Sequence, residues 1–123
     1  MTRDMDLVRE LLFEIERRPY NRSWFEIQIA DRSAAELGYH IMLLYQAGLI
    51  EASDQSYEQL DDASGWKPVA LTWSGHEFLA AAENVTTWNK AKALITDKGA
   101  GMAFELLKSL LIEIGKRATF AGI

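Results

Sequence analysis

Residues 33–48 form the segment that most constrains the fold, because the start, the end and the buried face of a helix can all be read there. Ser33 and Glu36 have the spacing of a capping box, which satisfies unpaired backbone N–H groups at a helix start. Gly48 is the residue type at which helices commonly end. The apolar residues at helical spacing between them are Leu37, Ile41 and Leu44. The sequence therefore predicts one helix with defined ends and a single apolar stripe.

Two elements are predicted before this helix. Met5–Arg18 carries apolar residues at helical spacing with charged residues mostly on the other face, and Pro19 follows it. This segment predicts an amphipathic helix. Phe25, Ile27 and Ile29 then alternate with polar residues, which is the period of a half-buried strand.

A hairpin is predicted after the helix of residues 33–48. Leu49–Ala52 is a short apolar piece, and Val69, Leu71 and Trp73 alternate in the manner of a second strand. The residues between the two pieces are polar and contain several acidic side chains. We expect this polar stretch to form a long loop, as the wing of a winged helix would.

Further helices are predicted in the remainder of the chain. Ser74 and Glu77 repeat the capping-box spacing and open a helix to about residue 83. Thr86 or Thr87 caps the next helix. One face of that helix carries Trp88, Ala91 and Ile95. The last helix runs from residue 102 to about 117, and its apolar stripe consists of Phe104, Leu107, Leu111 and Ile114.

The composition fits one domain in a reducing compartment. The chain has 123 residues, of which 49% are hydrophobic, which is ample for one core. It contains no cysteine, so disulfides and thiolate metal sites are excluded. Its start has no signal-like apolar stretch and its apolar runs are too short to span a bilayer, which favours a cytoplasmic location without membrane contact. We expect a single domain over residues 1–123, with a core over 1–83 and a helical extension over 84–123.

The order of these elements resembles a winged helix: helix, strand, helix and a two-stranded wing, followed by C-terminal helices. This order predicts a mainly helical α+β fold. A more extensive resemblance covers nearly the whole chain, and it is to domain of unknown function 2513, a family of small proteins of bacteria and their phages. The stretches that carry it are Arg3–Arg9, Tyr39–Ile50, Leu71–Leu79 and Trp88 with Lys90 and Lys92. The resemblance implies a winged-helix-like fold and a mobile-element context, and it implies no activity and no site.

Catalysis is not expected. The only histidines are His40, beside an apolar stripe, and His76, in the first turn of a helix, and we expect structural or surface roles for both. Ser74 and His76 point in different directions from a helix start, so they do not form a nucleophile and base. No glycine-rich phosphate loop is present. We therefore predict no catalytic residues, no metal and no cofactor.

DNA binding is the natural inference from a winged helix, but its usual contact positions disfavour it. Residues 33–48 contain no Lys or Arg, and the acids of the wing oppose only Lys67, so phosphates would be repelled. Those acids are Asp54, Glu58, Asp61 and Asp62. The net charge of −5 combines an acidic excess in residues 1–83 with a basic excess in 84–123. Nucleic-acid contacts would fall instead on Arg17, Arg18, Lys90 and Lys92, provided that these cations converge.

Tyr39, Met42 and Tyr45 are the predicted partner-binding residues. The apolar stripe of their helix must face the core, which turns these three residues at least partly outward. Tyrosine and methionine without charge suit a protein interface. Burial beneath another helix of the same chain is the alternative.

The last helix is the predicted dimer interface. Its stripe is widened beyond the needs of a surface helix by Leu106, Leu110 and Ile112. We therefore expect homodimerisation through Phe104, Leu107, Leu111 and Ile114, and burial within one subunit is the alternative.

These observations together favour a non-enzymatic winged-helix interaction module or regulator that acts through contacts with a protein partner. A transcriptional regulator that binds double-stranded DNA is the second interpretation. An accessory subunit of an enzyme is the third.

Overall fold

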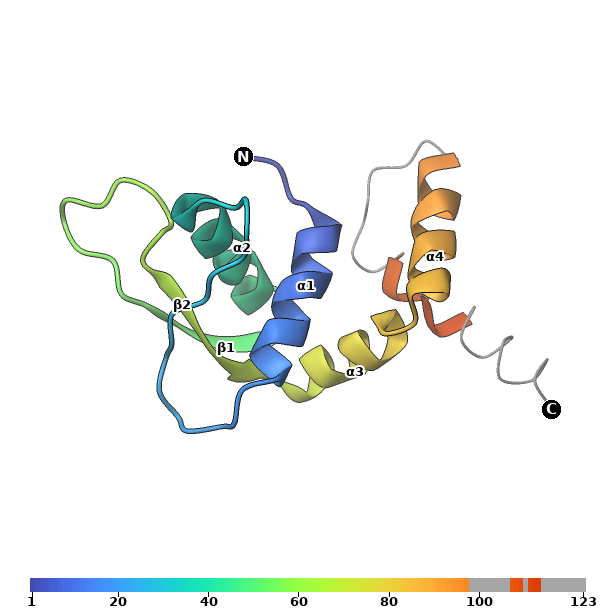
Figure 1. Cartoon of the computed structure of the whole chain (residues 1–123), viewed down its shortest axis with the longest axis horizontal. Helices are drawn as coiled ribbons and strands as arrows, with labels where there is room; N and C mark the ends of the chain where they lie inside the picture. The colour runs from blue at the N-terminus through green and yellow to red at the C-terminus, as the bar shows by residue number, and fades with distance from the viewer. Residues whose placement is uncertain (98–106, 110, 114–123) are drawn as a thin grey trace. The chain divides into compact units, whose positions relative to one another are not determined.

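Helices and one antiparallel hairpin make an α+β fold in the part of the chain that this computed structural model describes, residues 1–97, 107–109 and 111–113 (Figure 1). The predicted α+β class is confirmed. The helices are α1 (Met5–Glu16), α2 (Ala34–Gln46), α3 (Trp73–Ala82) and α4 (Val85–Asp97). The strands are β1 (Ile50–Asp54) and β2 (Trp66–Leu71).

The chain divides into two compact units, Met1–His76 and Glu77–Ile123. The first unit holds α1, α2 and the hairpin, and β2 contacts both of these helices. The prediction was a single domain over residues 1–123, with a core over 1–83 and a helical extension over 84–123. It stays a prediction. Among the described helices, none combines the length and the apolar character that crossing a membrane requires.

The two predicted helices of the first unit form, and their ends are set by local capping. Asp4 caps α1, because its carboxylate accepts hydrogen bonds from the N–H groups of Asp6 and Leu7. Ser33 caps α2 by accepting from the N–H of Glu36 at 3.0 Å. After α2, Gly48 has φ +77°, a conformation that glycine adopts without the steric cost other residues incur. The prediction for residues 33–48 is thereby confirmed.

The hairpin also forms where it was expected, with different bounds. β1 and β2 pair antiparallel from Ile50 opposite Leu71 to Asp54 opposite Trp66. An irregularity between Glu51 and Ala52 shifts the register. The buried apolar side chains of this unit are Met5, Leu7, Val8, Leu11, Leu12, Ile15, Leu37, Ile41, Leu44, Leu49 and Ile50. They include the predicted stripes of both helices.

The predicted strand at residues 25–29 is wrong. The expected alternation is present, since Phe25, Ile27 and Ile29 are half-buried and the residues between them are exposed. However, this extended segment is no strand, and the one backbone bond described between it and β2 runs from the Phe25 N–H to the Pro68 carbonyl, at 3.1 Å. Proline has no N–H to return a second bond, so a ladder cannot continue at that position.

The predicted extension of the second strand to Trp73 is also wrong. β2 ends at Leu71, and Trp73 begins α3 with 81% of its surface exposed, so it belongs neither to the strand nor to the core. The cap of α3 lies two residues before the expected Ser74. The Thr72 hydroxyl accepts from the Gly75 N–H at 3.1 Å. That hydroxyl also donates to the carbonyl of Gly48 at 2.6 Å, so it ties the start of α3 to the turn after α2.

The second unit has a core around Phe78 and Trp88, whose rings meet edge to face with centroids 6.3 Å apart. Asn84 caps α4 in place of the expected threonines, by accepting from the Thr87 N–H at 3.0 Å. Leu107 and Leu111 of the predicted dimer helix are fully buried within the single chain. The other two residues of that stripe, Phe104 and Ile114, and the side chain of Ile95 lie outside the described residues. Homodimerisation stays a prediction.

Candidate interaction surface

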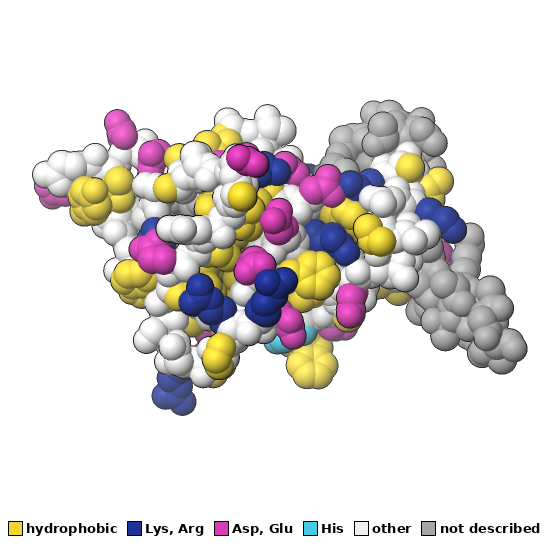
Figure 2. All heavy atoms as spheres, in the orientation of Figure 1, with side chains coloured by type: hydrophobic (Ala, Val, Ile, Leu, Met, Phe, Trp, Pro, Cys, Tyr) yellow, Lys and Arg dark blue, Asp and Glu magenta, His cyan; other side chains and the backbone are white. Residues whose placement is uncertain are grey.

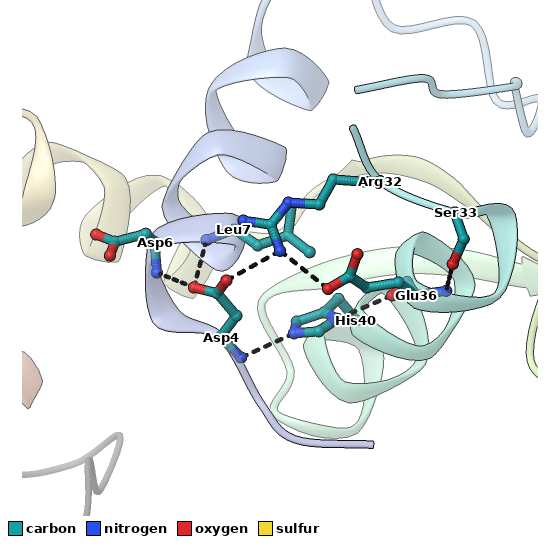
Figure 3. A network of polar contacts seen from close by, with 7 residues as sticks. All are labelled: Asp4, Asp6, Leu7, Arg32, Ser33, Glu36 and His40. Atoms are coloured by element: carbon teal, nitrogen blue, oxygen red, sulfur yellow. Dashed lines mark hydrogen bonds and ion pairs between the residues drawn. The ribbon is translucent and has the colours of Figure 1, made fainter. Parts of the chain in front are cut away.

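A polar network holds the start of α2 against the start of α1 (Figure 3). The Arg32 guanidinium lies 3.0 Å from the Asp4 carboxylate and 2.9 Å from that of Glu36. These three residues come from the cap of α1, the loop before α2 and the first turn of α2. The network therefore ties the start of α2 and the loop before it to the start of α1.

His40 completes this network from the interior. The side chain is fully buried, and both ring nitrogens are used (Figure 3). Nε2 accepts from the Asp4 N–H at 2.9 Å, so Nδ1 carries the proton and donates to the Glu36 carbonyl at 2.8 Å. His40 thus has a structural role, because it joins the start of α1 to α2. His76 is exposed on α3.

Asp4 gives the network a dependence on pH. Burial by itself would raise the pKa of Asp4, but hydrogen bonds from Leu7 and Asp6 and the Arg32 guanidinium outweigh this and lower that pKa below the ordinary 3.8. A carboxylate with a lowered pKa in the folded state adds stability above its unfolded pKa. That contribution is lost as the pH falls through the folded value.

Asp4→Asn should therefore lower the free energy of unfolding by about 0.5–1 kcal/mol at pH 7, and by less as the pH falls below 3.8. Asparagine keeps the capping oxygen and removes only the charge that faces Arg32. Urea unfolding at several pH values between 7 and 3 measures the difference. Asp61→Asn is the control, since Asp61 is exposed. If Asp4→Asn lowers the free energy of unfolding by the same amount at every pH, the Asp4 charge does not stabilise the network.

The hairpin loop covers the first half of the outer face of α2. Gly38 is buried, and a Cβ at this position would overlap the carbonyl group of Ala63 and lie 2.8 Å from the Cα of Ser64. Only glycine permits this approach of two backbones. The sequence contains a signal for this close approach. A glycine inside a helix costs about 1 kcal/mol relative to alanine, which indicates that another part of the chain packs against that position.

Only the end of that face is open. Of the predicted partner-binding residues, Tyr39 and Met42 are half-buried and Tyr45 is 48% exposed. The Tyr45 ring lies against that of Trp66, with centroids 5.4 Å apart and the planes tilted by 38°. Asp54 is directly opposite Trp66 in the hairpin, so both side chains lie on one face of the sheet. We call Tyr45, Trp66, Asp54 and the loop between the strands the α2–hairpin surface.

Acidic side chains dominate the loop of this surface. In Figure 2 acidic and hydrophobic side chains gather over the end of the hairpin loop. Asp54, Glu58, Asp61 and Asp62 are all exposed and, within the described residues, form no ion pair. Hydrogen bonds from the side chain and the N–H of Ser64 lower the pKa of Asp62, so this carboxylate stays charged. The neighbouring Lys67 bonds to Glu26 at 3.0 Å.

The predicted nucleic-acid contacts are divided between the two units. Arg17 is exposed and pairs with Glu14 at 2.9 Å, and the Arg18 guanidinium lies 4.3 Å from the centre of the Phe25 ring. In the second unit Lys90 is exposed, whereas the Lys92 ammonium lies 5.7 Å from the Trp88 ring. Arg18 and Lys92 thus have packing roles within their own units.

Two cavities lie in the first unit, and both are lined by carboxylates as well as by cations. One, of about 300 Å³, borders Trp66 and Gly38, and its cations Arg32 and Lys67 are already paired with carboxylates. The other, of about 470 Å³, is lined by the end of α1 and by β2, and it includes His76. Among the described residues, no group of three or more His, Asp or Glu side chains could hold a metal ion.

The geometry is thus that of a small α+β protein with an open aromatic and acidic surface at α2 and the hairpin. The chain belongs to the family of hypothetical proteins called domain of unknown function 2513 (DUF2513), whose model matches residues 2–101. It is 34% identical over 111 residues to a Haemophilus influenzae protein named only as an uncharacterized protein, covering 89% of this chain and 92% of that one. No solved structure matches the chain. The resemblance seen in the sequence is confirmed.

Proposed function

We propose that the chain is a non-enzymatic winged-helix module that binds another protein through the α2–hairpin surface. The order of α1, an extended segment, α2 and the β1–β2 hairpin supports a winged-helix arrangement. In this arrangement residues 25–29 take the place of the first strand and make one bond with β2. α2 then stands where a winged helix has its recognition helix.

The observation that carries this proposal is the chemistry of α2 and its wing. A recognition helix brings Arg, Lys, Asn or Gln to base edges and needs an open outer face. α2 has no Lys or Arg, and the loop covers it at Gly38. The acids of the wing repel phosphates. The part that stays open presents Tyr45 beside Trp66, and such aromatic side chains are enriched at protein interfaces.

Double-stranded DNA is the second candidate partner, because Arg17 and Lys90 are exposed cations outside this surface. The two proposals differ in what they predict for titration of a labelled random duplex with the full chain. We expect no binding tighter than about 10⁻⁴ M at physiological salt, the weak end of non-specific affinity.

A salt series separates the two candidates. Tight binding that falls steeply with salt, is lost in Lys90→Ala/Lys92→Ala and is kept in Tyr45→Ala would overturn the proposed function. That result would move the contact surface to the second unit.

A further inference from the structure

We infer that the partner presents a basic segment to the α2–hairpin surface, with arginine as the residue that the surface fits best. This inference rests on the proposed function and names the chemistry of the partner. It follows from two observations on neighbouring residues, an open pair of aromatic rings and an unbalanced set of carboxylates beside them.

The aromatic pair supplies a face for a planar cation. Tyr45 and Trp66 lie at 5.4 Å with their planes tilted, and about half of the Tyr45 surface is open to solvent. A guanidinium binds such faces by stacking and by attraction to the ring electrons, which an ammonium or a neutral amide does less well. Contacts of this kind occur among the described residues, with Arg9 over Phe13 at 4.8 Å and Arg18 over Phe25 at 4.3 Å.

The carboxylates supply the matching charge. Asp54 shares a sheet face with Trp66, and both of its described hydrogen bonds, from the N–H and hydroxyl of Ser56, end on Oδ1. Oδ2 is thus the oxygen of this carboxylate that can receive an external donor. From Ser53 to Trp66 the sequence has four acids and no Lys or Arg, so a bound cation meets no repulsion from this loop. An acidic or phosphate-bearing partner would be repelled.

Short labelled peptides titrated onto the full chain test this inference. Four peptides share a Gly/Ser frame and carry three arginines, three lysines, three citrullines or three glutamates. Citrulline has nearly the shape of arginine without its charge. We expect the arginine peptide to bind at least about tenfold more tightly than the citrulline peptide, and about two- to fivefold more tightly than the lysine peptide. The glutamate peptide should not bind.

Matched variants locate the site. Tyr45→Ala and Asp54→Asn should each weaken binding of the arginine peptide by about three- to tenfold, and the asparagine side chain keeps an oxygen that can accept from Ser56. Tyr20→Ala and Glu10→Gln remove an exposed tyrosine and an exposed carboxylate elsewhere, and they should leave binding within about twofold. Circular dichroism checks that every variant is folded.

Equal binding of the arginine and citrulline peptides, no binding of either, or equal losses in Glu10→Gln and Asp54→Asn would each overturn the inference. The last result would mean that binding reports only the net negative charge of the chain. The proposed function can be tested independently of this inference. A native protein partner that needs Tyr45 but presents a neutral or acidic surface would leave the function standing and refute the basic segment.

Discussion

Replacing His40 with alanine should lower the free energy of unfolding by about 3–5 kcal/mol, the largest effect expected for any single substitution in the network. The substitution removes a fully buried side chain and leaves a cavity. It also removes the acceptor of the Asp4 N–H, at 2.9 Å, and the ring's bond to the Glu36 carbonyl, at 2.8 Å. In a network these losses add to each other, because the start of α1 loses its tie to α2.

Urea unfolding of the full chain at pH 7 measures this loss. His76→Ala is the matched control, because His76 is exposed, and its effect should stay within about 0.5 kcal/mol. A cost below about 1 kcal/mol for His40→Ala would show that the network does not hold the two helices together.

The second large effect is expected at Gly38. Alanine in place of glycine inside a helix normally stabilises it by about 1 kcal/mol. Here the added methyl group overlaps the backbone of Ala63, and backbone atoms cannot yield as a flexible side chain would. We therefore expect Gly38→Ala to destabilise the protein by about 1–3 kcal/mol, with the hairpin loop displaced from α2.

Hydrogen exchange distinguishes this mechanism from general destabilisation. Gly38→Ala should speed exchange across the loop between β1 and β2. Gly48→Ala serves as the comparison, because its cost of about 1 kcal/mol comes from a positive φ with no atom within 4 Å, and the loop should keep its protection. If Gly38→Ala instead stabilises the chain, the loop does not rest on α2.

Short-range sequence patterns predicted most of the helices and strands of the first unit. The ends of α2 could be predicted because Ser33, Glu36 and Gly48 act within one or two turns of the helix that they bound. The hairpin followed from a short apolar piece, Leu49–Ala52, and from the alternation that begins at Val69, with the polar stretch between them. The errors arose where a distant residue decides the outcome. Pro68 prevents a ladder with residues 25–29, and the bond from Thr72 to the Gly48 carbonyl moves the start of α3.

The candidate site was predicted only in part, for the same reason. Helical geometry placed Tyr39, Met42 and Tyr45 on the flank of the apolar stripe, and the structure leaves Tyr45 the most open of the three. The pairing of Tyr45 with Trp66 depends on strand register and on how α2 crosses β2, and periodicity within one segment contains neither. The network of His40 likewise joins residues 36 positions apart in the chain.

Site-specific photocrosslinking from position 45, in cells of the native source, tests the central claim most directly. A photoreactive phenylalanine analogue replaces Tyr45 in one experiment and the exposed Tyr20 in a control. The proposed function predicts a discrete adduct from position 45 that protease removes and nuclease leaves intact, with none from position 20. A nuclease-sensitive adduct from position 45, or adducts only from analogues placed at Lys90 or Lys92, would contradict it.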